Sequence, residues 1–365
     1  MKILYVMTIS ASLTFFPEHF KLLKDMGYTI EVAANFDGGI PDCCNEIEFK
    51  IHHIPFSRSP LSKMNLTAFK ELKKLVKDGG YDIVHTHTPN ASIITRLACT
   101  RLRKKGLKVF YTAHGFHFYK GAPLKNWILF YSAEWLCSFF TDKLITMNAE
   151  DYERAKTKFH AKETCYVNGV GIDLNRFKGC TVSKTEKRLE LGLPEDATVL
   201  LSVGELNKNK NHQMIIRVLA RLNNPNIHYA IAGVGEKSEY LLNLAKELGV
   251  AEKVHLLGYR KDISEINYTA DVFCFPSMRE GLPVSLMEAM ACGLPCAVSK
   301  IRGNTDLIDQ NGGRIFDPHS VEECENAVRE LINGDKASLG EYNICKVEKY
   351  SNENVIKQMK EIYQE

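Results

Sequence analysis

Short runs of apolar and β-branched residues alternate with longer amphipathic stretches along this chain of 365 residues. The runs with the length and composition of buried strands are KILYVM, YTIEVAA, DIVHTH, KVFYTAH and KLITMN in the first half, and TVLLSVG, IHYAIAG, KVHLLG, DVFCFPS and PCAVSK in the second. Between them, stretches such as residues 65–77 and the segment from Asn211 onward place apolar residues at helical spacing. This alternation predicts parallel sheets whose strands are connected by right-handed helical crossovers.

The same pattern occurs twice, and the chain is long for a single hydrophobic core. We therefore expect an α/β protein with two Rossmann-like, doubly wound domains facing each other across a cleft. A ligand would bind in that cleft, at the carboxyl ends of the strands. The first domain is expected in residues 1–168 and the second in residues 169–345. The join falls in CYVNGVGIDLNRF, where Gly169 and Gly171 loosen the backbone before a polar stretch.

The end of the chain, KYSNENVIKQMKEIYQE, spaces Val355, Met359 and Ile362 along one helical face. Residues 346–365 are therefore expected to include a closing helix that packs back towards the first domain.

Composition indicates a reducing, aqueous environment. Eleven cysteines form no CxxC or Cys/His metal spacing, and Cys99, Cys137 and Cys274 lie inside apolar runs, as small core residues do. No run of 18 apolar residues is present, and the apolar N-terminal run breaks at Thr8 and Ser10 without a clear signal-peptide cleavage site. We expect a cytoplasmic protein. Nucleic-acid binding has little support, because no basic run has interleaved aromatics.

Two neighbouring segments allow a membrane-surface role. Residues 96–108 contain six cations and no acid, which fits either a solvated helix face or attraction to an anionic surface. Residues 126–140, NWILFYSAEWLCSFF, are apolar almost all round and contain both tryptophans. A core helix is the default interpretation, and the alternative is a helix that dips into the inner face of the cell membrane.

The stretch REGLPVSLMEAMACGLP sets Glu280 and Glu288 eight residues apart. It follows a predicted strand, Pro283 suits a first helical turn, and Gly293 suits a helix end. The two carboxylates would then lie on the order of 10 Å apart, beside a helix N-terminus whose free N–H groups favour phosphate. Solvated surface glutamates are the plain alternative. In the other interpretation, Glu280 holds sugar hydroxyls, Glu288 holds a ribose, and a diphosphate lies between them.

In its full frame, PSMREGLPVSLMEAMACGLPCAVS resembles the E-x7-E signature of retaining glycosyltransferases of family 4, which have the GT-B fold. The resemblance covers nearly the whole chain. It includes VHTHTPNAS, TAHGFHFYKGAPLKN, VNGVGID, SVGELNKNKNH, LLGYRKDI and IRGNTDLI, which are similar to capsular and exopolysaccharide members of that family.

The resemblance implies roles for individual residues. Glu280 would contact the donor sugar near the reacting centre and Glu288 the nucleotide ribose. The backbone from Gly281 through Leu282 and Pro283 to Val284 would hold the diphosphate. In the GEL-x-x-x-K stretch that begins at Gly204, Lys210 would contact the leaving diphosphate, and His114 of TAHG would face the donor sugar.

The chain departs from the family pattern at two places. Glu205 replaces the family's phosphate-binding arginine, so a second cation must come from elsewhere, and Arg279 and Arg260 are the candidates. The N-terminal glycine-rich loop of the family is replaced by MTISASLTFF. His85, His87 and His117 are interpreted as core histidines. His85 and His87 alternate on one strand face, but no carboxylate or cysteine is spaced to complete a metal site with them.

These observations predict a retaining hexosyl or N-acetylhexosaminyl transferase that needs no metal and no cofactor. It would move a sugar from a nucleoside diphosphate, with UDP favoured as the common carrier, to a hydroxyl of a lipid-linked glycan in surface polysaccharide synthesis. The alternatives are a sugar-nucleotide epimerase of the same architecture and a non-catalytic nucleotide-sugar-binding subunit.

Overall fold

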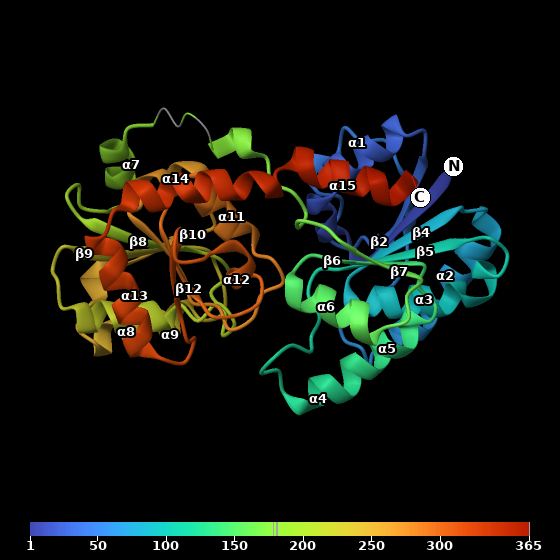
Figure 1. The fold of residues 1–365 in the computed structure, drawn as a ribbon, viewed down its shortest axis with the longest axis horizontal. Coiled ribbons are helices and arrows are strands. Elements are labelled where there is room, and N and C mark those ends of the chain that lie inside the picture. The colour runs from blue at the N-terminus through green and yellow to red at the C-terminus, as the bar shows by residue number, and fades with distance from the viewer. Residues whose placement is uncertain (178, 180–181, 365) are drawn as a thin grey trace. The chain divides into compact units, whose positions relative to one another are not determined.

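The computed structural model describes residues 1–177, 179 and 182–364, and these form two compact units (Figure 1). Unit 1 contains Met1–Gly171 together with the segment from Asn352 onward, and unit 2 contains Ile172–Ser351. The divisions after residues 171 and 351 lie a few residues beyond the boundaries expected from the sequence.

Unit 1 is built on a parallel sheet of seven strands in the order β3-β2-β1-β4-β5-β6-β7. The strands are β1 (Lys2–Ile9), β2 (Thr29–Asn35), β3 (Lys50–His53), β4 (Ile83–His87), β5 (Lys108–Ala113), β6 (Lys143–Thr146) and β7 (Glu163–Tyr166). The helices are α1 (Pro17–Asp25), α2 (Met64–Gly79), α3 (Pro89–Arg103), α4 (Leu124–Asn126), a π-helical turn (Trp127–Tyr131), α5 (Ser132–Ser138), α6 (Ala149–Lys158) and α15 (Asn352–Gln364).

Unit 2 is built on a parallel sheet of six strands in the order β10-β9-β8-β11-β12-β13. The strands are β8 (Thr198–Val203), β9 (Ile227–Ala232), β10 (Val254–Gly258), β11 (Val272–Phe275), β12 (Cys296–Ser299) and β13 (Gly313–Phe316). The helices are α7 (Lys184–Glu190), α8 (Gln213–Leu222), α9 (Ser238–Glu247), α10 (Ile263–Thr269), α11 (Val284–Ala291), α12 (Asn304–Leu307), α13 (Val321–Asn333) and α14 (Lys336–Val347).

Short 3₁₀ turns complete the described elements. They are Ser10–Phe15, Asp42–Cys44, Leu174–Phe177, Ala251–Lys253 and Glu348–Tyr350.

The predicted fold class is confirmed, because both sheets are parallel and every run interpreted as a strand forms one. Helices cover both faces of each sheet, so successive residues of a central strand enter different cores. In unit 1, Leu4 and Val6 of β1 pack in one core while Ile3 and Tyr5 pack in the other. Three strands were not predicted from the sequence: β3, β7 and β13, whose sequences KIHH, ETCY and GRIF are short and each contain a charged residue. Each lies at an edge of its sheet.

Three local predictions need correction. Pro283 caps α11 and lies just outside its first turn. The core-helix interpretation of residues 126–140 is wrong for one side of the segment, because Ile128, Leu129 and Leu136 are exposed. In the neighbouring basic run, Arg96 does not reach solvent. It is fully buried, and its guanidinium lies 2.7 Å from the Glu134 carboxylate and 4.3 Å from the centre of the Tyr111 ring.

Helix α15 is tied into unit 1 by its last turn. The Tyr363 hydroxyl lies 2.5 Å from the Tyr5 hydroxyl and 2.6 Å from Nδ1 of His85. Lys143 Nζ donates to the carbonyl of Ile362 at 3.0 Å. The buried face of the helix carries Val355, Met359 and Ile362, the three apolar residues noted in the sequence.

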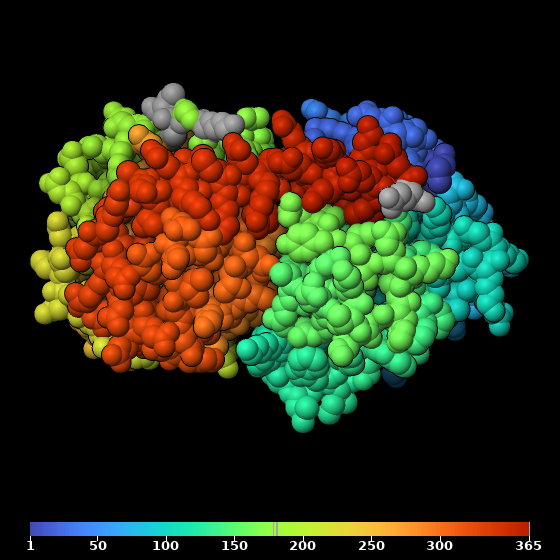
Figure 2. All heavy atoms as spheres, in the orientation of Figure 1, coloured from blue at the N-terminus to red at the C-terminus, as the bar shows by residue number. Residues whose placement is uncertain are grey.

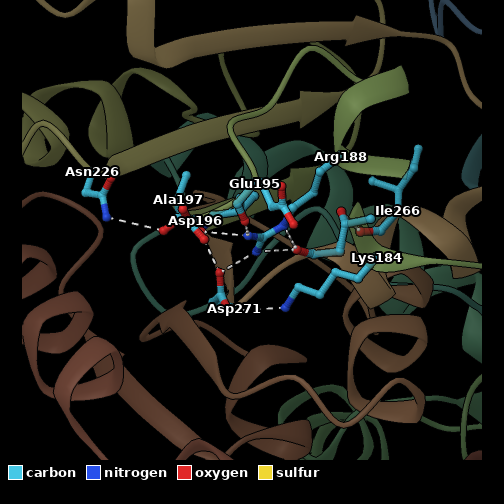
Figure 3. Close-up of polar contacts among 10 residues, drawn as sticks. Lys184, Arg188, Glu195, Asp196, Ala197, Asn226, Ile266 and Asp271 are labelled. Atoms are coloured by element: carbon cyan, nitrogen blue, oxygen red, sulfur yellow. Dashed lines mark hydrogen bonds and ion pairs between the residues drawn. The ribbon is translucent and has the colours of Figure 1, made fainter. Parts of the chain in front are cut away.

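Unit 2 is braced at the amino ends of its strands by Arg188 of α7 (Figure 3). This buried guanidinium donates to the carbonyls of Glu195, Ala197 and Thr269 and to the carboxylate of Asp271. Asp271 in turn accepts the backbone N–H of Val199 at 2.8 Å. The cluster therefore fixes α7 to the starts of β8 and β11, at the opposite end of the sheet from the loops that follow those strands.

Replacing Arg188 with methionine should destabilise unit 2 by about 3–5 kcal/mol, because it leaves a partly buried carboxylate and three carbonyls without their cationic donor. Chemical denaturation followed by circular dichroism measures the loss. Arg217→Met, at an exposed position of α8, is the matched control and should change stability little. Equal stability of the two variants would contradict a bracing role for the cluster.

Candidate functional site

Three loops meet at the carboxyl edge of the unit 2 sheet. They follow β8, β11 and β12, which are neighbours in the strand order. The loops contain, respectively, Gly204–Lys210, Ser277–Pro283 and Lys300–Gly303. Because parallel strands end at one edge, stretches about 70 and 95 residues apart in sequence are brought together.

The loop carrying Glu280 is held from both sides. From the β8 loop, Asn209 accepts the N–H of Met278 at 2.8 Å and donates its side-chain amide to the Arg279 carbonyl at 2.9 Å. From the β12 loop, Arg302 donates Nε to the Glu280 carbonyl at 3.1 Å. These bonds hold the backbone and leave the Glu280 carboxylate available for other contacts.

Gly303 lets the β12 loop come this close. Its φ is +78°, and a Cβ there would lie 2.3 Å from the carbonyl oxygen of Gly281. No side chain fits in that space, so any other residue at 303 would displace the loop. The glycine of RGN is thus required for the position of the EGLP loop.

Lys210 and Glu280 form an ion pair, with Nζ 2.8 Å from Oε1. The ammonium also lies 4.6 Å from the centre of the Phe275 ring. The Lys210 side chain passes close to the backbone of Gly204, where a Cβ would lie 3.0 Å from Lys210 Cε. The backbone N–H of Lys210 donates to the side chain of Asn207 at 3.0 Å. The structure therefore brings together the predicted cation and the first predicted glutamate.

The second glutamate lies on α11, which begins at Val284 after the cap residue Pro283. The first N–H groups of the helix have no intrahelical acceptor and lie next to Gly281 and Leu282 in the chain. Glu288 is half-buried one turn further along, and loss of hydration raises its pKa to about 7, although the positive charge of Arg176 opposes the shift. A carboxyl group whose pKa lies near 7 is stabilised in its ionised form by ligand hydroxyls that donate hydrogen bonds to it.

The candidates for a second cation differ in their surroundings. Arg260 is bound by the carboxylates of Asp262 and Glu190, with nitrogen-to-oxygen distances of 2.5–2.8 Å. Arg279 is half-buried, and no carboxylate forms an ion pair with it among the residues that the structure describes. Glu205 is exposed and accepts the side-chain amide of Asn207 at 3.0 Å.

In unit 1, His114 lies directly after β5, among other histidines. Its Nε2 is 3.3 Å from Nδ1 of His87, which ends the adjacent strand β4. His85, two residues before His87, contacts Thr112 and Tyr363 through its two ring nitrogens. His19 is buried beside these histidines, and the backbone of Val170 lies close to its ring. Sequence reasoning missed the contact of His87 with His114, although their positions at the ends of adjacent strands are a usable signal.

Burial keeps these rings neutral. The pKa values of His19 and His114 are lowered to about 4, and those of His85 and His87 fall well below the ordinary value, in each case mainly because burial removes water from the ring. Neighbouring histidines lower the pKa values of His19, His85 and His87 further.

A pocket of about 310 Å³ opens at the carboxyl edge of the unit 1 sheet. Its lining includes Thr8 and Ile9 at the end of β1 and Thr88 after β4, while Arg58 and His117 contribute polar groups. The interpretation of His117 as a core histidine is wrong, because this ring is only half-buried and lines the pocket. Thr88 has a φ of +64°, which is uncommon for a β-branched residue, and its hydroxyl lies 2.7 Å from that of Thr8. A strained residue in a pocket at this edge is typical of a binding site.

Within the described ranges, no group of three His, Cys, Asp or Glu side chains is arranged to hold a metal ion. His85 and His87 are 4.2 Å apart by ring centres, but His85 uses both of its nitrogens in hydrogen bonds.

Two parallel Rossmann-like sheets with an E-x7-E loop and helix at the carboxyl edge of the second define a GT-B glycosyltransferase. The comparisons with known proteins agree. The family model "Glycosyl transferases group 1" matches residues 183–344, and "Glycosyl transferase 4-like" matches residues 2–148. The chain belongs to the group 1 glycosyltransferases, family 4, whose members transfer a sugar from a nucleotide-sugar with retention of configuration.

Individual relatives span the full chain. EpsD of Bacillus subtilis, described as a glycosyltransferase, is 34% identical over 99% of this chain and 96% of its own. The UDP-Gal:alpha-D-GlcNAc-diphosphoundecaprenol alpha-1,3-galactosyltransferase of Escherichia coli is 28% identical over 94% of this chain and 90% of its own. Among solved structures, HepE of Anabaena in complex with UDP and glucose shares the fold, with a TM-score of 0.82 at 18% identity, covering 100% of this chain and 99% of HepE.

Acidification should destabilise unit 1. The unfolded chain protonates its histidines near pH 6.5, whereas the folded protein keeps these four rings of the histidine cluster neutral, so the unfolded state binds more protons below that pH. The free energy of unfolding therefore falls as the pH drops from about 6.5 towards about 4, by up to about 1.4 kcal/mol per pH unit for each ring. Urea unfolding followed by tryptophan fluorescence reports on unit 1, because Trp127 and Trp135 are the protein's two tryptophans.

The slope of the unfolding free energy against pH reports how many more protons the unfolded chain binds. His19→Phe should lower that number by about one. The matched control His319→Phe, at an exposed position of unit 2, should leave it unchanged. A slope that stays the same in His19→Phe would contradict the assignment of His19 to the group of rings held neutral.

Proposed function

We propose that this enzyme transfers a hexosyl or N-acetylhexosaminyl group from a UDP-sugar to a hydroxyl of a lipid-linked glycan during the synthesis of a surface polysaccharide. The proposal depends above all on one observation, the ion pair of Lys210 with Glu280 beside the N-terminus of α11. The names of the relatives support it: one acts with UDP-Gal on a diphosphoundecaprenol-linked sugar, and others are O-antigen biosynthesis glycosyltransferases.

In this proposal the diphosphate of the donor accepts from the backbone N–H groups of Leu282 and Val284 at the start of α11, where the helix dipole favours an anion. Glu288 accepts hydroxyls of the ribose, and Glu280 accepts hydroxyls of the donor sugar. When the donor binds, Lys210 moves its charge from Glu280 towards the diphosphate and stabilises the negative charge that develops there as the glycosidic bond breaks.

Arg279 is the better candidate for the second cation. It precedes Glu280 in the same loop, whereas Arg260 is already neutralised by two carboxylates. A guanidinium held in that way would have to break both ion pairs before it could bind a diphosphate.

The acceptor hydroxyl attacks the anomeric carbon from the face that the diphosphate leaves, and its proton passes to a phosphate oxygen. That route retains configuration without a covalent enzyme intermediate, so Glu280 positions the sugar and stabilises charge and is not a nucleophile. His114 contributes a neutral hydrogen-bonding group for the donor sugar, and its lowered pKa supports this role. The acceptor occupies the unit 1 pocket at Thr8, Arg58 and His117.

Replacing Lys210 with methionine should lower kcat by about 10²–10³-fold, because the leaving diphosphate loses its cation. The assay measures transfer from a UDP-sugar to a lipid-linked or short-chain glycan acceptor. Lys208→Met, at an exposed position of the same loop, is the matched control and should keep kcat. A Lys210→Met enzyme with normal kcat would remove Lys210 from the reaction.

The same assay separates the proposal from its alternatives. Turnover that requires an acceptor supports a transferase. Isomerisation of the donor sugar without an acceptor would indicate an epimerase, and nucleotide binding without any turnover would indicate a non-catalytic subunit.

UDP affinity should rise about tenfold between pH 6 and pH 8. The free protein holds a proton on Glu288 up to about pH 7, and ribose hydroxyls bind the ionised form, so binding releases the proton and strengthens as the pH passes 7. Isothermal titration calorimetry of Glu288→Gln, compared with the native chain at each pH, cancels the ionisation of UDP itself. Below pH 7 the native chain should release about one proton more than Glu288→Gln for each UDP bound. Identical plots of UDP affinity against pH for the two proteins would contradict the role of Glu288.

A further inference from the structure

Six large apolar side chains of unit 1 face solvent along one short helical segment. This segment consists of α4, the π-helical turn, α5 and the residue after it, Phe139. Figure 1 shows α4 at the rim of unit 1, and the same rim is drawn as spheres in Figure 2. We call the six residues the apolar stripe: Leu124, Ile128, Leu129, Trp135, Leu136 and Phe139. Leu124 and Ile128 are 73% and 66% exposed. Large apolar side chains that gather on the exposed side of one segment indicate a candidate interaction surface.

The fold itself turns the stripe outward. Glu134, on the opposite side of the segment, is buried in its ion pair with Arg96 of α3, and Cys137 and Ser138 are buried beside it. On the outer side, the rings of Trp135 and Phe139 pack edge to face, with their centres 5.1 Å apart. Breaking the buried ion pair would be needed to rotate the apolar side chains inward, so their exposure is a stable property of the fold.

Cations accompany the stripe. Helix α3 packs against α5. Its last turn carries exposed Arg101, exposed Lys104 and Lys105 follow directly after the helix, and Lys125 lies within the helical segment. Arg103 is not available in the same way, because Asp142 accepts from its guanidinium at 2.8 Å. Between residues 96 and 108 and between residues 124 and 139, the one carboxylate is that of buried Glu134. The exposed surface of the two segments is therefore apolar and positively charged.

This chemistry fits an anionic bilayer better than a second copy of the chain. In a two-fold dimer through the stripe, the same cations would face each other without carboxylates to pair with. At an anionic lipid surface they face head groups of opposite charge, and tryptophan is a preferred residue at that depth. Among the described helices none is long and apolar enough to cross a bilayer, so the contact would be one of a helical segment lying in the interface.

We propose that the apolar stripe, with Arg101, Lys104, Lys105 and Lys125, is a docking surface for an anionic lipid bilayer. The placement fits the proposed function, on which its biological meaning rests: Phe130, in the middle of the same helical segment, lines the unit 1 pocket together with His117. With the apolar stripe docked on the bilayer, the unit 1 pocket would lie near the membrane surface. A glycan linked to a lipid in that bilayer could then reach the pocket.

The test is vesicle flotation of the full chain with phosphatidylcholine vesicles that contain 0 or about 30% phosphatidylglycerol, a fraction chosen to give a substantial surface potential. Two variants are compared with the native chain: Leu129→Ser with Leu136→Ser in the stripe, and Arg101→Gln with Lys104→Gln and Lys105→Gln beside it. Matched controls are Leu66→Ser, 69% exposed on α2, and the triple change Lys73→Gln, Lys74→Gln and Lys77→Gln on the same helix.

The native chain should bind the anionic vesicles at least tenfold more strongly than the neutral ones. The triple cation variant should lose about a hundredfold, or roughly fivefold for each cation removed. The stripe variant should lose binding to both vesicle types, and both controls should bind like the native chain. Trp127 and Trp135, the two tryptophans, lie in the segment itself, so brominated lipids should quench the native fluorescence.

Binding that ignores the phosphatidylglycerol content, or that both variants retain, would overturn the proposal. Self-association in sedimentation experiments that disappears in the stripe variant, without vesicle binding by the native chain, would instead assign the stripe to a dimer. UDP binding in solution should be the same in all of these proteins. Loss of vesicle binding with normal UDP binding therefore concerns only the docking surface, whereas a native chain that binds vesicles but not UDP contradicts the proposed function alone.

Discussion

All strands of each sheet run in the same direction, and the site depends on that constraint. A parallel strand can be connected to its neighbour only by a crossover along the sheet face, so every loop that follows a strand emerges at one edge. In unit 2 the loops after β8, β11 and β12 are thereby forced together, although their sequences are far apart. The bonds of Asn209 and Arg302 to the backbone around Glu280 are possible only because of this convergence.

Within that frame, a small number of close contacts place the charged groups. The absence of a side chain at Gly303 lets the β12 loop support the EGLP loop, and the absence of one at Gly204 lets Lys210 reach Glu280. The ion pair with Glu280 holds the Lys210 ammonium beside the N-terminus of α11, where we propose that the diphosphate binds. The raised pKa of Glu288 reflects its position on a half-buried part of α11, where the carboxylate gains most from a ligand that donates hydrogen bonds.

The sequence was sufficient for the fold class and for the strands at the sheet centres, because strands buried on both faces are continuous apolar runs. It was insufficient for β3, β7 and β13, which lie at the sheet edges and carry polar residues. The E-x7-E frame located the two glutamates, because a strand, a glycine turn and a capped helix are local features. The contact of His87 with His114 and the burial of Arg96 against Glu134 depend on packing between distant segments, which periodicity and spacing do not contain.

The central claim is that the edge formed by the β8, β11 and β12 loops is where the nucleotide binds. Hydrogen exchange of the full chain, followed by mass spectrometry with and without UDP, tests it without requiring knowledge of the sugar or the acceptor. The account predicts slower exchange in residues 204–210 and 279–288, with the largest change at the amides that begin α11, where the free N–H groups would bind the diphosphate. Protection elsewhere in the chain with no change in those two segments would contradict it.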